Sequence, residues 1–224
     1  MSRHLILFDC DGTLVDSQHD IVTAMDHAFT AHGLAPPAKA ATLSIVGLSV
    51  PEAIRALMPN VSQALLETLA RDFRAGAPTQ RVTGGRDNPL YPGALDAITE
   101  LARRDDTVLG VATGKSRRGV DRLFDQYGWH AHFATVQTAD TNRSKPDPDM
   151  ILTAMAETGV GPERTMMIGD TSFDMAMARA AGVTAIGVTW GYHAHSSIVE
   201  HGAQAVVHSF AELLATIGRL QQRA

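Results

Sequence analysis

The chain has 224 residues, of which 45% are hydrophobic and 19% are charged, and its formal net charge is −5. This composition suits a soluble α/β protein with room for an insertion. The acidic balance and the lack of an extended basic patch exclude a general affinity for nucleic acid. The single cysteine, Cys10, excludes an intrachain disulfide, and no apolar stretch is long enough to span a bilayer. Because the chain start lacks the apolar region of a signal peptide, we expect a cytoplasmic protein that does not bind membranes.

The first predicted element is a buried strand that ends in two acids. Residues 5–8 are apolar, and the turn-forming segment Asp-Cys-Asp-Gly-Thr follows at residues 9–13. Asp and Gly are common in turns, so a plain turn is one interpretation. Charged side chains are costly to bury, however, and sites in open α/β sheets lie beyond the carboxyl ends of strands. Asp9 and Asp11 are therefore candidates for one nucleophile and one general acid and base.

Three stretches with helical periodicity come next. The first has apolar residues at helical spacing from Ile21 to Phe29, and the third has them from Leu65 to Phe73. Between them, Ser49-Val50-Pro51-Glu52 matches the pattern of a capping box, with proline near the first helical position. Glycines and prolines from residue 76 to residue 89 then end the periodicity. The sequence predicts an all-helical insertion, which we place at residues 16–88.

After residue 92 the pattern alternates between helix and strand. We predict strands at residues 108–112, 133–137, 165–168, 184–188 and 205–208, with helices between most of them, and a closing amphipathic helix from residue 210. This alternation predicts an α/β fold: a parallel sheet with helices on both faces. Right-handed crossovers would bring the strand ends at Asp9, Thr113 and Asp170 to one edge of the sheet.

The second predicted strand ends in a hydroxyl and a glycine. Thr113 and Gly114 are followed by Lys115-Ser116, so backbone N–H groups near the glycine could face a phosphate. A plain strand-to-helix turn with Ser116 as N-cap explains the segment equally well. A P-loop needs four residues between its glycines, and only three lie between Gly110 and Gly114, which argues against a nucleoside triphosphatase.

Two later segments carry further charged candidates. Lys145 stands next to Pro146, whose stiff backbone favours a fixed lysine that neutralises a phosphoryl group over a solvated surface charge. Asp170 follows an apolar strand, and Asp174 lies four residues on. Either acid could instead cap a helix that begins near residue 172. Without accompanying thiolates or clustered histidines, carboxylates of this kind suit Mg²⁺ better than zinc.

In this order, the motifs resemble those of the haloacid dehalogenase superfamily over nearly the whole chain, and the pattern is most similar to its phosphoglycolate phosphatase branch. The resemblance implies a Rossmann-like catalytic core at residues 1–15 and 89–224, with residues 16–88 as a helical cap domain. It also implies a Mg²⁺-dependent phosphoric monoester hydrolase that forms an aspartyl-phosphate intermediate. The implied substrate is a small phosphorylated metabolite, phosphoglycolate or a similar compound.

The resemblance also implies a role for each candidate residue. The implied roles are catalysis (Asp9 as nucleophile, Asp11 as general acid and base, with Thr113 and Lys145), phosphate binding (Thr113, Gly114, Lys145), metal binding (Asp9, the Asp11 backbone carbonyl, Asp170) and support of Lys145 or a metal-bound water (Asp174). The sequence does not predict an oligomeric state.

Four alternatives stay open at this point. A dehalogenase of the same superfamily expels halide and needs no acid at Asp11. Sugar phosphomutases look similar around residues 47–49, but they carry an arginine where this chain has Val50 and an acid where it has Gly169. Pyrophosphatases of the same fold also match. A catalytically silent phosphate or metal sensor is the alternative from a different class, although all the acids are present.

Overall fold

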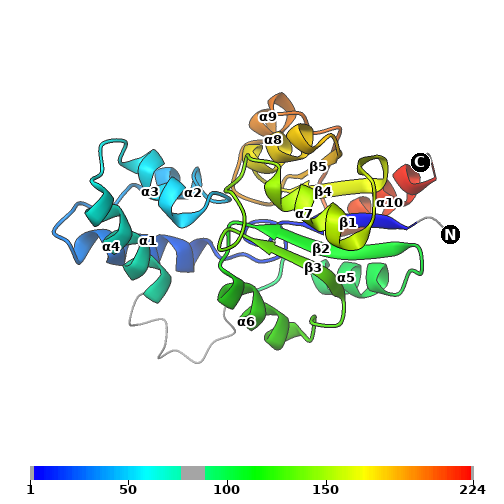
Figure 1. The fold of residues 1–224 in the computed structure, drawn as a ribbon, viewed down its shortest axis with the longest axis horizontal. Helices are drawn as coiled ribbons and strands as arrows, with labels where there is room; N and C mark the ends of the chain where they lie inside the picture. The colour runs from blue at the N-terminus through cyan, green and yellow to red at the C-terminus, as the bar shows by residue number, and fades with distance from the viewer. Residues whose placement is uncertain (1–2, 77–88, 223–224) are drawn as a thin grey trace.

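One central sheet organises the computed structural model, which describes residues 3–76 and 89–222 (Figure 1). Six strands pair in parallel in the order β3-β2-β1-β4-β5-β6. Their bounds are His4–Phe8 (β1), Thr107–Thr113 (β2), Phe133–Thr138 (β3), Thr165–Gly169 (β4), Thr184–Val188 (β5) and Ala205–Val207 (β6). The predicted parallel sheet is confirmed, and the predicted strand limits differ from these by at most one residue.

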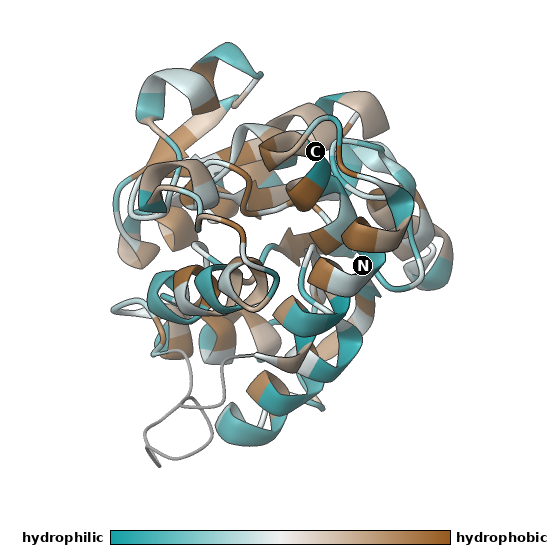
Figure 2. Cartoon of the chain, turned by 90° about the vertical axis from the view of Figure 1, so that its left-hand side faces the viewer, coloured by the Kyte–Doolittle hydropathy of each residue, from teal (hydrophilic) through white to brown (hydrophobic). Residues whose placement is uncertain are grey.

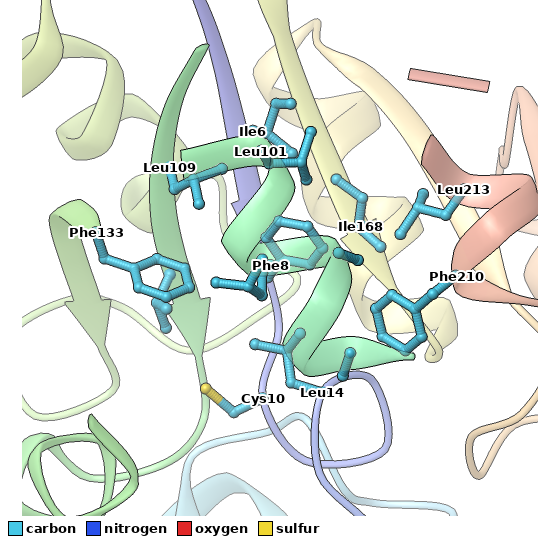
Figure 3. Packing of buried hydrophobic residues seen from close by; sticks show 14 of the residues in the cluster. Ile6, Phe8, Cys10, Leu14, Leu101, Leu109, Phe133, Ile168, Phe210 and Leu213 are labelled. Carbon is cyan, nitrogen blue, oxygen red and sulfur yellow. The ribbon is translucent and has the colours of Figure 1, made fainter. Parts of the chain in front are cut away.

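Helices cover both faces of the sheet, as the sequence predicts. One face packs against α5 (Ala94–Ala102), α6 (Arg117–Tyr127) and α10 (Phe210–Gln221), and the other packs against α7 (Asp149–Thr158), α8 (Ser172–Ala181) and α9 (His195–Glu200). The alternation of β1 explains the two cores, because successive side chains of a strand point to opposite faces. Ile6 and Phe8 pack in the first core (Figure 3), whereas Leu5 and Leu7 pack in the second. A short 3-10 turn, Pro162–Arg164, precedes β4.

Four helices lie to one side of the sheet, on the left of Figure 1. They are α1 (Gln18–Thr30), α2 (Lys39–Leu43), α3 (Val50–Leu57) and α4 (Gln63–Ala75). Seen from that side, in Figure 2, hydrophilic and hydrophobic residues alternate along the helical ribbons. The hydrophobic residues form a separate small core around Met25, Ile54 and Leu69. Among the described residues, no helix is long and apolar enough to cross a membrane.

The sequence predicts three of these four helices. One half of the predicted capping box is confirmed at the start of α3, where the Ser49 side chain accepts a hydrogen bond from the Glu52 backbone N–H; the Ser49 backbone N–H donates to Ser144 Oγ instead of to Glu52. The pattern misses α2, because this five-residue helix buries only Thr42 and therefore has no apolar stripe. Residues 77–88, the end of the predicted insertion, lie outside the described residues, and the limits at 16 and 88 stay a prediction.

The chain leaves the sheet and returns to it at one place. The Asp16 backbone N–H donates to the Pro89 carbonyl at 2.9 Å, and the Tyr91 N–H donates to the Leu14 carbonyl at 3.0 Å. Val15 and Leu90 form an antiparallel bridge between these two bonds. The connections before α1 and after residue 88 therefore run side by side.

Candidate active site

The carboxyl ends of three neighbouring strands form the site. Because β1 lies between β2 and β4, the residues that end or follow these strands share one edge of the sheet. Asp9, Thr113 and Asp170 stand there, and all three are buried. One carboxylate oxygen each of Asp9, Asp170 and Asp174 lies within 4.8 Å of the others. The structure thus brings together the acids that the strand pattern places at this edge.

Asp9 lies at the centre of the acidic group. Its Oδ1 accepts a hydrogen bond from the Cys10 backbone N–H at 2.7 Å, and its Oδ2 lies 3.0 Å from Lys145 Nζ. Burial raises the pKa of Asp9 to about 6, although Lys145 and a side-chain hydrogen bond from Thr113 act in the opposite direction. Asp9 is therefore buried with its Oδ2 against the Lys145 ammonium group.

Asp170 is held by two donors and enclosed by backbone. Thr13 Oγ1 donates to its Oδ1, and the Tyr192 backbone N–H donates to its Oδ2, each at 2.8 Å. A Cβ atom on Gly12 would lie 2.3 Å from Asp170 Oδ2, so only glycine leaves room for the carboxylate. Burial and the neighbouring charges of Asp174 and Asp9 raise the pKa of Asp170 well above its ordinary value. A divalent cation would offset this accumulation of negative charge.

Asp174 both caps a helix and orients Lys145. Its Oδ2 accepts from the Thr171 backbone N–H at the start of α8, while its Oδ1 accepts from Lys145 Nζ at 2.6 Å. Lys145 is fully buried; burial acts to lower its pKa, but Asp174 and Asp9 raise it. Asp174 can therefore cap the helix and support Lys145 at the same time, the two roles that the sequence leaves open. A Cβ atom on Gly169 would lie 2.3 Å from Asp174 Cγ, so a side chain there would displace this carboxylate.

Asp11 has different partners from Asp9, although one residue separates them. Its Oδ1 accepts hydrogen bonds from Ser17 Oγ at 2.6 Å and from Lys115 Nζ at 2.7 Å. Burial acts to lower the pKa of Lys115, but the Asp11 carboxylate raises it. The Ser17 backbone N–H in turn donates to the Tyr192 hydroxyl at 2.9 Å. The Asp11 side chain is thus fixed beside the acidic group and is not one of its three members.

The sequence does not single out the residues that hold Asp11 and Asp170 in place. Lys115 has a signal, since it lies two residues after the end of β2, at the edge where the strand ends meet. Thr13 also has one, because it belongs to the same turn as the two acids. Tyr192 has no local signal; it reaches the site because β5, the strand before it, pairs with β4.

A cavity of about 820 Å³ opens above the strand ends. Asp9, Asp11 and Thr113 line it from the sheet, and Met25 and Phe73 line it from the helical insertion. This volume lies within the range of roughly 300–1,000 Å³ typical of small-molecule sites. The strand ends therefore face a space that a small ligand could occupy.

The insertion rests directly on the sheet edge beside this cavity. A Cβ atom on Gly114 would lie 2.6 Å from the Leu48 carbonyl oxygen, so the close contact with the insertion requires glycine there. The Ser49 backbone N–H also donates to Ser144 Oγ at 2.8 Å. Gly114 lines the cavity as well, which is compatible with its predicted contact to phosphate.

The donor set fits a hard divalent cation. Three buried carboxylates meet, and Lys145 is the cation paired with two of them. Oxygen-only ligands of this type are those that Mg²⁺ prefers, whereas zinc sites use mainly sulfur and nitrogen.

Comparison with known proteins agrees with this fold. The model of the haloacid dehalogenase-like hydrolase family matches residues 6–188, and the chain therefore belongs to that family. It is 31% identical over 214 residues to the "Probable phosphatase IndB" of Dickeya dadantii, which covers 95% of this chain and 92% of that protein. It is 32% identical over 218 residues to the phosphoglycolate phosphatase of Agrobacterium fabrum, with 93% and 90% covered. Among solved structures, a hydrolase from Pseudomonas syringae superposes with a TM-score of 0.84 at 23% identity, with 98% and 99% covered.

Proposed function

We propose that this chain is a Mg²⁺-dependent phosphatase that hydrolyses a small phosphate monoester, phosphoglycolate or a similar metabolite, through an aspartyl-phosphate intermediate. One observation carries the proposal. Asp9 lines the cavity, it is grouped with Asp170, Asp174 and Lys145, and a second carboxylate with separate partners follows two residues later. Relatives named phosphatase and phosphoglycolate phosphatase, at about 30% identity, support the substrate class.

The proposed metal ligands are Asp9, the Asp11 backbone carbonyl and Asp170. When bound, Mg²⁺ would offset the repulsion between the Asp9 carboxylate and the anionic ester, which lowers the barrier to nucleophilic attack. The charges of Asp170 and Asp174 would then be partly neutralised as well. Thr13 and the Tyr192 backbone would keep Asp170 oriented through the hydrogen bonds described above.

The proposed reaction has two steps. A carboxylate oxygen of Asp9 attacks phosphorus, the bond from phosphorus to the ester oxygen breaks, and Asp11 gives its proton to the departing oxygen. Asp11 then takes a proton from water, whose oxygen attacks the same phosphorus. The acyl phosphate bond breaks, and inorganic phosphate and the Asp9 carboxylate result.

The remaining candidates bind the transferring group. Thr113 ends β2 at the cavity floor, and its hydroxyl and the Gly114 N–H would donate to phosphoryl oxygens. Lys145 would stabilise the charge that develops on those oxygens. Asp174 holds Lys145 Nζ in position at 2.6 Å. These residues act through placement and charge and do not exchange protons with the substrate.

A sugar phosphomutase of the same fold is the nearest alternative. Two residues argue against it: Val50 stands where the similar phosphomutases carry an arginine, and Gly169 stands where they carry an acid. A side chain at position 169 would occupy the space of the Asp174 carboxylate. Product analysis with a hexose phosphate tests the alternative, since an isomerised sugar phosphate without released phosphate would overturn the proposal that the chain is a hydrolase.

Phosphate release would likewise exclude a catalytically silent sensor, and an assay with pyrophosphate would detect a pyrophosphatase.

The central test is substitution of the nucleophile. Asp9→Asn should abolish Mg²⁺-dependent phosphate release from phosphoglycolate, because an amide cannot form the covalent intermediate. Asp105→Asn is the matched control, since Asp105 is exposed and precedes β2 at the opposite end of the sheet. Full turnover by purified Asp9→Asn protein would refute the proposed mechanism.

A further inference from the structure

One wall of the cavity gathers positive charge that the proposed reaction does not use. Lys115, just before α6, and Arg118 and Arg122, in its first turns, line the cavity; Lys115 is paired with Asp11, so the two arginines carry the unused charge. Neither arginine forms an ion pair within the described part of the chain, although the neighbouring Arg117 pairs with Asp121. Asp125 also lines this wall, but its carboxylate pairs with His130. In a chain with a net charge of −5, this local excess of positive charge requires an explanation.

The other walls of the cavity carry fewer cations than this one. The side formed by the insertion is largely apolar, with Ile21, Met25 and Phe73 among its lining residues, and its charged lining residues are one acid and one arginine, Asp20 and Arg74. On the floor, Asp9 is paired with Lys145, and Asp11 is paired with Lys115. An additional negative charge on a ligand would therefore find on the α6 wall two arginines, Arg118 and Arg122, that form no ion pair within the described residues.

The local geometry keeps the cations together. A Cβ atom on Gly119 would lie 2.9 Å from Lys115 Cγ, so the lysine stem lies along the glycine face of α6. Arg122 is close enough to act on Lys115 as a like charge. Arg118 and Arg122 are one helical turn apart, about 6 Å along the axis. Like charges at this spacing repel, and a bound anion would remove that cost.

We infer that Arg118 and Arg122, with Lys115 beside them, form a subsite for a second anionic group carried by the leaving group of the phosphate ester. The inference rests on the proposed function and narrows it. The substrate class is a phosphate monoester with a carboxylate or second phosphate on its carbon skeleton. The phosphoryl group lies at Asp9, the second anion lies against α6, and the skeleton contacts the apolar insertion.

The test compares esters that differ only in this second charge. Phosphoglycolate and ethyl phosphate form one pair, and 3-phosphooxypropanoate and propyl phosphate form a longer pair. Wild-type protein should show a higher kcat/KM for the acid of each pair. In Arg118→Gln/Arg122→Gln protein, the preference should fall about tenfold, while kcat/KM for the ester without a carboxylate changes less than twofold.

Two further variants separate the subsite from general effects of charge. Arg117→Gln removes an arginine from the same helix outside the cavity and should leave the preference unchanged. Arg118→Lys/Arg122→Lys keeps both charges and should retain most of the preference. Equal kcat/KM for both members of each pair in wild-type protein, or an unchanged preference in the double glutamine variant, would overturn the subsite alone. Failure of wild-type protein to release phosphate from any ester would overturn the proposed function, and the subsite with it.

Discussion

Asp9 and Asp11 illustrate how backbone position gives two like residues different chemistry. Asp9 follows the last residue of β1 and is buried against two other carboxylates and one lysine. Asp11 lies in the following turn and accepts hydrogen bonds from Ser17 and Lys115 at the cavity. The proposed hydrolysis in two steps requires a nucleophile and a separately placed general acid and base, and these two environments are compatible with that division.

Asp11→Asn should lower kcat about 10²–10⁴-fold with phosphoglycolate, the usual contribution of general acid and base catalysis. The asparagine oxygen can still accept from Ser17 and Lys115, so the fold and substrate binding should persist. With p-nitrophenyl phosphate, whose leaving group needs no proton, formation of the aspartyl phosphate should be slowed much less. Rapid-quench measurement of both esters provides the comparison. An equal loss for the two esters would contradict the role of Asp11 as acid.

For individual site residues, the sequence predicts those that end strands and misses those that only tertiary structure brings to the site. Asp9, Thr113 and Asp170 could be placed together because parallel strands end at a common edge. The hydrogen bond from Tyr192 to Asp170 depends on β5 pairing with β4, which no local pattern reveals. The position of Lys115 two residues after β2 is visible in the sequence, but its ion pair with Asp11 is not, because a lysine after a strand is usually solvated.

Among the elements, β1 combines a central position in the sheet with an unusual first residue. His4 is buried, and neither ring nitrogen has a hydrogen-bond partner among the described residues. Burial lowers the pKa of His4, with Asp106 acting against this and Arg164 acting with it. In the unfolded chain His4 has a pKa near 6.5. Below about pH 6.5, His4 therefore binds more protons in the unfolded chain than in the folded chain.

His4→Leu should remove part of the acid sensitivity of folding. Because the folded pKa is the lower one, His4 makes the free energy of unfolding decrease as pH falls below about 6.5, by at most about 1.4 kcal/mol per pH unit. Urea unfolding at pH 7.5 and pH 5.5 should show a smaller difference for the variant than for wild type. His19→Gln, at an exposed position, is the control and should not change this difference. The prediction fails if His4→Leu and His19→Gln have the same pH dependence.

The elements also show where periodicity is informative. The limits of β1 to β6 are predicted closely because most of these strands are short apolar runs between turn residues, although β3 also contains Thr135, Gln137 and Thr138. Helix α2 was missed because five residues with one buried threonine carry no periodic signal. Pattern reading therefore succeeds where an element buries a continuous face and fails where neighbouring elements hold it in place.

For the whole molecule, the acidic group would couple folding to the binding of a metal ion. Three buried carboxylates meet beside one paired lysine, and burial together with the neighbouring carboxylates raises the pKa values of Asp9 and Asp170. A cation that binds only the folded state would stabilise it by mass action. Stability measurements can therefore detect the metal without any assay of turnover.

Mg²⁺ at about 100 times its dissociation constant should raise the free energy of unfolding by about 2.7 kcal/mol, or Tm by roughly 5–10 °C. Asp170→Asn should lose most of this response. Without Mg²⁺, the same variant should be at least as stable as wild type, because it removes a buried charge next to Asp9 and Asp174. Differential scanning calorimetry with and without EDTA tests both statements. An undiminished response in Asp170→Asn would exclude this residue as a ligand.

The adjacent positions of Val15 and Leu90 would allow the helical segment to be removed or exchanged by protein engineering. Since the helical segment departs and rejoins at adjacent points, its removal would leave a gap that a tight hairpin turn can bridge. Every strand of the sheet would keep its neighbours, and no crossover would need rerouting. The architecture is therefore modular: helical segments from other members of the family could be grafted at this junction to give chimaeras with altered ligand preference on an unchanged scaffold.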